Sequence, residues 1–171
     1  ANVAAIRTHE GLILVDTGGF LFAPKIHGMM RAWSRAPVHT AIYTHGHLDH
    51  IGGIELYDAE ARPSGVKPLQ VLAHRALPER FARYKMTRGY NGCINGRQFS
   101  TQLEWPDTYR EPDAVFDHEV TLRIGDVEAR LFHDRGETDD HTWAWFPESK
   151  VLATGDLFIW ASPNAGNPQK V

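Results

Sequence analysis

A short polar segment follows an apolar run in the first third of the chain, and it constrains the fold more than any other feature. The apolar run, residues 38–43, is typical of a buried strand, and it leads into His45-Gly46-His47-Leu48-Asp49-His50. Side chains i and i+2 of an extended segment point the same way, so His45 and His47 can chelate one ion. Asp49 and His50 follow where the chain bends into a helix, and they suit a neighbouring ion. We therefore predict a metal site at this strand end.

Apolar and alternating segments on both sides of this cluster predict strands that come in pairs. Strands are expected at residues 3–6, 12–15, 38–43, 68–73, 120–124, 127–132, 142–146 and 151–153. Helical spacing is expected at residues 24–35, 52–56 and 74–92, the last ending in Gly89 and Asn91-Gly92, with irregular chain over residues 93–113. This order favours an α+β fold of two packed sheets with outer helices. The length favours a single domain over residues 1–171.

Composition excludes several classes of partner. Eighteen Lys and Arg against 21 Asp and Glu give a net charge of −3, so the chain lacks the basic footprint of a protein that binds nucleic acid or an anionic membrane surface. The single cysteine, Cys93, excludes an internal disulfide framework. Ten histidines, by contrast, are many, and histidine is the commonest metal ligand. We expect a metal cofactor and a small-molecule substrate, and neither nucleic acid nor a membrane as a partner.

These motifs resemble those of the metallo-β-lactamase superfamily. The His-x-His-x-Asp-His signature of that family stands at residues 45–50, and its upstream Asp-Thr-Gly stands at Asp16-Thr17-Gly18. Residues 136–138, 147–152 and 154–156 match its third-ligand loop, its hairpin and its metal-bridging aspartate, so the similarity covers residues 3–159. The resemblance implies an αβ/βα sandwich with metal ions at one edge, and a hydrolase that uses metal-bound hydroxide.

The resemblance also implies a dinuclear metal site with assigned ligands. These are His45, His47 and Glu137 for the first ion, Asp49 and His50 for the second, and Asp156 as a bridge between them. Two metal ions about 3.5–4 Å apart can share a hydroxide, which Asp49 would orient in a base-like, catalytic role. We expect Zn²⁺, with Mn or Fe as alternatives because Glu137 adds a negative charge.

The third-ligand loop departs from the family pattern, because Glu137 stands where a histidine is usual. Two histidines plus one glutamate is an established zinc set, so Glu137 is chemically suitable. His133 and His141 flank the loop and are the alternative ligands; otherwise they support the site from behind. Asp16 is predicted to hold the metal loop from below rather than to bind metal. Its alternative interpretation is a turn residue that ends a strand.

A second departure concerns the last metal ligand. The family supplies a histidine well downstream of its bridging aspartate, and no histidine follows Asp156 here. We therefore expect a chain truncated at one or both ends; the alternative is a weak second metal site. Lost strands would expose a sheet edge, so a homo-oligomer or a complementing chain segment is expected to cover it. Because the native start is also expected to be missing, the compartment stays open, with the cytoplasm slightly favoured.

Glutamate at the third-ligand position also resembles the alkylsulfatase branch of the superfamily. Residues 88–92 with Arg97 are similar to an Asn- and Arg-containing segment of that branch. Arg88, Asn91 and Arg97 are therefore candidates for substrate contact, since arginine matches oxyanions with paired donors. The alternative is a polar surface loop. The resemblance is partial, because the branch replaces the bridging aspartate by glutamate and Asp156 does not follow it.

Three functions compete for this sequence. The first is a metal-dependent hydrolase that acts on a small sulfate ester, thioester, lactone or amide. The second is a non-catalytic metal-binding module on the same scaffold. The third is a nucleic-acid phosphodiesterase of the same superfamily, which the net charge of −3 disfavours. We favour the first.

Overall fold

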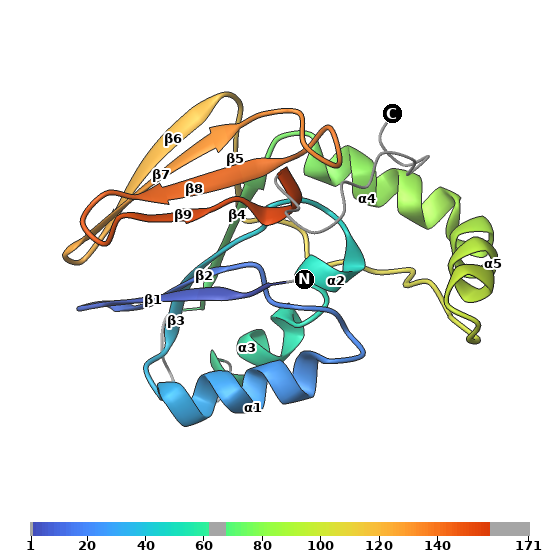
Figure 1. Cartoon of the computed structure of the whole chain (residues 1–171), viewed down its shortest axis with the longest axis horizontal. Helices are drawn as coiled ribbons and strands as arrows, with labels where there is room; N and C mark the ends of the chain where they lie inside the picture. The colour runs from blue at the N-terminus through green and yellow to red at the C-terminus, as the bar shows by residue number, and fades with distance from the viewer. Residues whose placement is uncertain (1, 62–67, 158–171) are drawn as a thin grey trace.

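The strands form two sheets in a computed structural model of the chain, which describes residues 2–61 and 68–157 (Figure 1). The first sheet has the order β1-β2-β3-β4-β5 and contains β1 (Ala4–Thr8), β2 (Gly11–Val15), β3 (Val38–Ile42), β4 (Gln70–His74) and β5 (Ala114–Phe116). The second has the order β6-β7-β8-β9 and contains β6 (Glu119–Ile124), β7 (Val127–His133), β8 (Thr142–Phe146) and β9 (Val151–Ala153).

The direction of the strands decides where the site can form. β1 and β2 are an antiparallel hairpin, whereas β2, β3, β4 and β5 run parallel to one another. The second sheet is antiparallel throughout. Parallel strands bring their carboxyl ends to one edge of a sheet, which is where ligands bind in such folds. The histidine segment leaves β3 at this edge.

Helices connect the parallel strands. They are α1 (Ala23–Trp33), α2 (Leu48–Ile51), α3 (Ile54–Ala61), α4 (Leu77–Met86) and α5 (Arg88–Gln98), followed near the end of the described chain by a short 3₁₀ turn, η1 (Gly155–Leu157). Figure 1 shows α1 and α3 on the side of the first sheet that faces away from β6–β9. In the described part of the chain, no helix is both long and apolar enough to cross a bilayer.

Alternation along β2 divides the interior into two apolar layers. Leu12 and Leu14 belong to the cluster that packs against the helices, together with buried side chains of α2, α3 and α4. Ile13 and Val15 belong to the cluster between the two sheets, where they join residues of β7 and β8. Because both faces of β2 are covered, every residue of this strand is buried. The expected α+β fold of two packed sheets with outer helices is therefore confirmed.

The sequence pattern misplaced two helical segments and missed one strand. The short helix expected at residues 52–56 is instead two helices, α2 at residues 48–51 and α3 at residues 54–61. The helical segment expected at residues 74–92 is two helices, and α5 continues to Gln98, well into the stretch expected to be irregular. Gly92 and Gly96 lie inside α5, where only glycine fits. A Cβ atom at position 92 would lie 2.9 Å from the backbone oxygen of Leu103, and one at position 96 would lie 2.8 Å from that of Thr101. Close packing of the following chain thus overrides the low helix propensity of glycine. β5, at residues 114–116, is too short to show a period.

The interface between the two sheets supplies much of the stability of the fold. Leu131 on β7 is fully buried there, whereas Leu152 on β9 is 54% exposed. Leu131→Ala should lower the free energy of unfolding by about 2–5 kcal/mol, because it removes buried apolar area and leaves a cavity. The same change at Leu152 should cost less than about 0.5 kcal/mol. Chemical denaturation measures both variants, and equal losses would contradict this account of the core.

Candidate metal centre

The histidine segment is buried at the carboxyl end of β3. His45 and His50 are almost inaccessible to solvent, at 0% and 1% exposure, and His47 is at 11%. His47 adopts an extended backbone immediately before α2, so the chain turns from strand to helix within this segment. The turn is tight enough to bring all three imidazoles together, since the ring centroid of His45 lies 4.6 Å from that of His47 and 4.2 Å from that of His50.

A first group of ligand-type side chains consists of His45, His47 and Glu137. The Nε2 atom of His45 lies 2.9 Å from Nδ1 of His47, and Oε2 of Glu137 lies 3.0 Å from Nδ1 of His47 and 3.6 Å from Nε2 of His45. All three side chains are mostly buried. Glu137 arrives from the loop between β7 and β8, almost one hundred residues further along the chain.

A second group lies against the first and shares His45 with it. Its other members are His50 and Asp156, whose Nε2 and Oδ2 atoms are 3.4 Å apart. Asp49 also approaches His50, with 3.5 Å between its Oδ2 and the same Nε2, but its side chain is 60% exposed. Asp156 reaches this position because Gly155 has a positive φ of 52° and packs on Thr44, where a Cβ atom would approach within 2.7 Å.

Asp16 and Thr44 fix the orientation of two of the imidazoles. The carboxylate of Asp16, at the end of β2, accepts hydrogen bonds from the backbone N–H and the hydroxyl of Thr44 and from Nδ1 of His50, at 2.7–2.9 Å. The side-chain oxygen of Thr44 in turn lies 3.0 Å from Nδ1 of His45 and accepts a hydrogen bond from it. With both Nδ1 atoms donating, the Nε2 atoms of His45 and His50 are left to face the two groups.

These donor sets fit metal ions. Ligand atoms 2.0–2.2 Å from a tetrahedral zinc ion are roughly 3.3 Å apart, and the atoms of the first group are 2.9–3.6 Å apart. Nε2 of His50 is buried and has no hydrogen-bond partner in the described part of the chain, although two carboxylates lie near it. A buried ring nitrogen left in this state is suited to coordinate a cation, so residues of both groups could hold one.

The carboxylates around His50 change its proton affinity in the metal-free protein. Burial lowers the pKa of His50, but Asp16 and Asp156 outweigh burial and raise it to about 10. The imidazolium of His50, whose Nε2 lies 3.4 Å from Oδ2 of Asp156, holds the pKa of Asp156 below its usual value. Burial moves the pKa of His45 well below its ordinary value, so this ring is neutral. Cation binding at the second group must therefore displace a proton from His50.

The two histidines that flank the third-ligand loop belong to neither group. Nδ1 of His133 donates to the backbone oxygen of His141 at 2.8 Å, and its ring stacks on His74 with 3.6 Å between centroids. His141 stacks beside His45, and its Nε2 donates to the backbone oxygen of Thr154, two residues before Asp156. The geometry brings Glu137 to the first pair of histidines, while His133 and His141 support the surrounding loops.

The predicted substrate contacts lie on α5 and interact locally. Arg88 forms an exposed ion pair with Asp107 at 3.2 Å, Arg97 is exposed, and the amide of buried Asn91 donates to the hydroxyl of Thr87. These contacts join α5 to its own surroundings rather than to the two ligand groups, and the proposed role of the three side chains stays a prediction.

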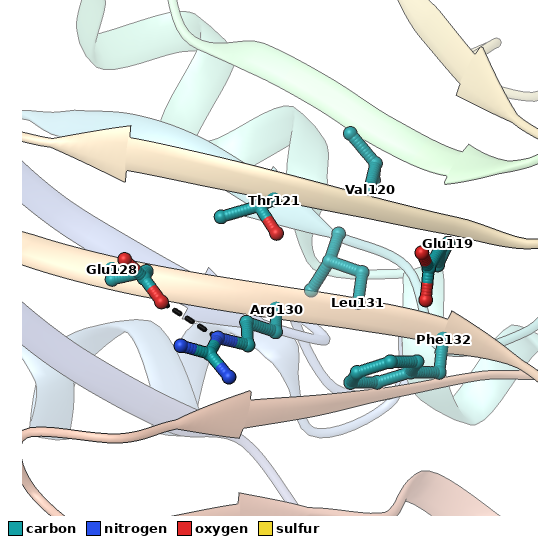
Figure 2. A pocket seen from close by; sticks show the side chains of 7 residues that line it. All are labelled: Glu119, Val120, Thr121, Glu128, Arg130, Leu131 and Phe132. Atoms are coloured by element: carbon teal, nitrogen blue, oxygen red, sulfur yellow. Dashed lines mark hydrogen bonds and ion pairs between the residues drawn. The ribbon is translucent and has the colours of Figure 1, made fainter.

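A shallow hollow on the second sheet is separate from the metal groups. Figure 2 shows its walls on β6 and β7, where Glu128 and Arg130 form an ion pair, with 2.6 Å between Oε1 and Nε. None of the residues predicted for the metal site lines this hollow.

Three residues next to the two ligand groups were not predicted from the sequence. Thr44 gave no signal, because a threonine at a strand end is ordinary. Arg80 and Asp140 form a buried ion pair beside Gly46, with 2.7 Å between Nε and Oδ1. The position of Arg80 was available from the sequence, because it lies on the buried face of α4 with Leu77, Phe81 and Tyr84.

Comparison with known proteins places the fold and the motifs in one family. The family model described as the metallo-beta-lactamase superfamily matches residues 1–163. The chain belongs to this superfamily. It spans 32%, 54% and 52% of the lengths of three curated relatives that it matches, an alkylsulfatase and two metallo-beta-lactamases.

The relatives are named for different activities. The chain is 39% identical over 182 residues to the 2,4-dinitroanisole O-demethylase subunit alpha of Nocardioides sp. (strain JS1661), covering 91% of this chain and 50% of that protein. It is 23% identical over 171 residues to the linear primary-alkylsulfatase of Pseudomonas sp. (strain ATCC 19151), covering 89% and 32%. A solved B3 metallo-beta-lactamase with an active-site glutamic acid superimposes with a TM-score of 0.57 at 27% identity, covering 84% and 50%.

The proton on His50 provides a test of the network around Asp16. In the metal-free protein, Asp16→Asn should lower the pKa of His50 from about 10, because Asp16 is the leading cause that raises it. Asp49→Asn should lower it less. NMR titration of the imidazole measures both. Because the folded pKa is raised, the stabilisation by His50 is present below its ordinary pKa and is lost as the pH rises through about 10. An unchanged pKa in Asp16→Asn would contradict the network.

Proposed function

We propose that this chain carries the active site of a dinuclear zinc hydrolase that acts on small ester-like substrates. Superfamily membership and the two ligand groups support a metal-dependent hydrolase in general. The observation that carries the finer proposal is the convergence of His45, His47 and Glu137 into one buried group, with His50 and Asp156 directly beside it. His45 has one free ring nitrogen and can serve only one ion, so a second ion would rely on His50 with the nearby carboxylates of Asp49 and Asp156.

The first ion would be held by His45, His47 and Glu137. The geometry supports Glu137 because its carboxylate approaches both rings. A solved relative at 27% identity is named for an active-site glutamic acid, which supports the same role. Compared with three histidines, this set carries one more negative charge, so the bound ion is a weaker Lewis acid and Mn or Fe are more readily accepted.

The second ion would be held by His50 and Asp49, with Asp156 between the two ions. Asp16 would keep Nε2 of His50 pointed at the site through the bond to Nδ1. Bound ions would supply the Lewis acidity that activates water and stabilises negative charge on the substrate. Asp49 differs from the other ligands because it is mostly exposed, so its carboxylate can orient the attacking water and accept a proton from it.

The substrate is expected to be a small molecule with a sulfate-ester, thioester, lactone or amide bond. The names of two relatives extend this range, since one acts on linear primary alkyl sulfates and another removes the O-methyl group of 2,4-dinitroanisole. The chain spans 32% of the first relative and 50% of the second. Arg88, Asn91 and Arg97 remain the candidates within this chain.

Metal content tests the first group directly. His47→Ala should abolish zinc binding there, because it removes one of three protein ligands and leaves Glu137 opposite a single imidazole. Cys93→Ala should leave zinc content unchanged, since Cys93 is exposed on α5. Elemental analysis after dialysis measures both variants. Full zinc stoichiometry in His47→Ala would contradict the assignment.

Turnover tests the catalytic half of the proposal. The zinc-loaded full-length protein should hydrolyse at least one member of a panel that contains aryl and alkyl sulfates, thioesters, lactones, amides and aryl methyl ethers. Asp49→Asn should lower kcat by about 10²–10⁴-fold, the usual contribution of a general base. A zinc-loaded protein that hydrolyses no member of the panel would favour the non-catalytic module. Turnover of phosphodiesters alone would favour the phosphodiesterase.

A further inference from the structure

A buried carboxylate joins the two chain segments that supply the first ligand group. Oδ2 of Asp140 accepts a hydrogen bond from the backbone N–H of Gly46 at 2.8 Å. Gly46 lies between His45 and His47, and Asp140 lies three residues after Glu137. One side chain therefore connects the segment that carries both imidazoles to the loop that carries the carboxylate. Asp140 is only 1% exposed, so water does not compete for this bond.

Arg80 holds Asp140 from the other side. Its Nε donates to Oδ1 of Asp140 at 2.7 Å, and its Nη2 donates to Oδ1 of the neighbouring Asp139. Arg80 is 4% exposed and comes from α4, an element that contributes to neither ligand group. Both carboxylate oxygens of Asp140 are thus engaged by protein donors, and the guanidinium of Arg80 bridges Asp140 to Asp139.

Steric contact restricts the same segment. A Cβ atom at position 46 would lie 2.8 Å from Cδ of Arg80 and 3.0 Å from Cδ1 of Leu77. The backbone between the two imidazoles therefore rests directly on the α4 side chains that carry the ion pair. It cannot move towards α4, and the bond to Asp140 opposes movement away from it.

We propose that Asp140 and Arg80 are positioning residues that set the distance between Glu137 and the imidazoles of His45 and His47. They bind no metal themselves. They hold the first group at coordination spacing before an ion arrives, so that less of the binding free energy is spent on ordering the ligands. Partners of this kind commonly change metal affinity by 10–100-fold. The inference rests on the proposed metal function, because it concerns affinity for that ion.

The decisive variant removes the charge of Asp140 and keeps its shape. Asp140→Asn should bind Zn²⁺ at least about tenfold more weakly than the wild type in competition with a chelator, although every ligand is retained. Co²⁺ provides a second readout, because its absorption spectrum reports the geometry of the ligands. Arg80→Lys keeps the charge but not the fork, and it should show a smaller loss in the same direction.

An ion pair elsewhere in the molecule provides the matched control. Asp58 on α3 pairs with Arg110, with 2.9 Å between Oδ2 and Nε, and both side chains are largely buried. Arg110 also pairs with Asp113, whose carboxylate accepts a hydrogen bond from the backbone N–H of Val71. Val71 lies near the start of β4, so this ion pair is at the end of the sheet opposite the histidines. Asp58→Asn should lower thermal stability but leave Zn²⁺ affinity within about twofold of the wild type.

The outcomes separate the two proposals. If folded Asp140→Asn binds Zn²⁺ as tightly as the wild type, or if Asp58→Asn weakens binding equally, the positioning role is wrong. If the wild type binds no Zn²⁺, the proposed function fails first. Hydrogen exchange of the Gly46 amide in the wild type then still tests its hydrogen bond to Asp140. The same measurement replaces the binding assay if the variants do not fold. The Gly46 amide should exchange as slowly as those of β3, and exchange as fast as that of an exposed turn would overturn the inference.

Discussion

The carboxylate of Asp16 is the contact on which the site depends. Parallel pairing of β2 and β3 places the ends of both strands side by side, and Asp16 follows β2 with a positive φ of 62°. From there it accepts hydrogen bonds from Thr44, directly before the histidine segment, and from His50 at its far end. A buried carboxylate needs such donors to offset its desolvation. The donors that stabilise Asp16 are therefore the groups that orient the histidine segment.

Thr44 extends this network to the second sheet. Its backbone oxygen accepts from the N–H of Thr142 at 2.7 Å, so the start of β8 is joined to the end of β3. The loop that precedes β8 carries Glu137, and the turn that follows β9 carries Asp156. Ligand-type side chains separated by about a hundred residues meet because the two sheets pack at this edge. Packing of the apolar layer between the sheets is thus a condition for the chemistry at their edge.

Much of the candidate site could be predicted from the sequence because most of its ligand-type residues lie close together in one short segment. Three histidines and an aspartate within six residues after a buried strand indicate a metal site by themselves, and the strands followed from their periods. Glu137 required the family resemblance, because spacing alone did not separate it from His133 and His141. Arg80 and Asp140 escaped notice because their meaning depends on α4 packing on Gly46, a contact between distant segments. The second half of α5, residues 93–98, was not predicted for the same reason, since the glycines of this helix suit a close packing that the sequence does not display.

Anomalous scattering from a zinc-soaked crystal tests the central claim most directly. Two peaks should appear at the carboxyl end of β3. One should lie about 2.0–2.2 Å from ligand atoms of His45, His47 and Glu137. The other should lie beside His50 and Asp156. A crystal with zinc bound only elsewhere, or with Glu137 and Asp156 turned away from the imidazoles, would contradict the account.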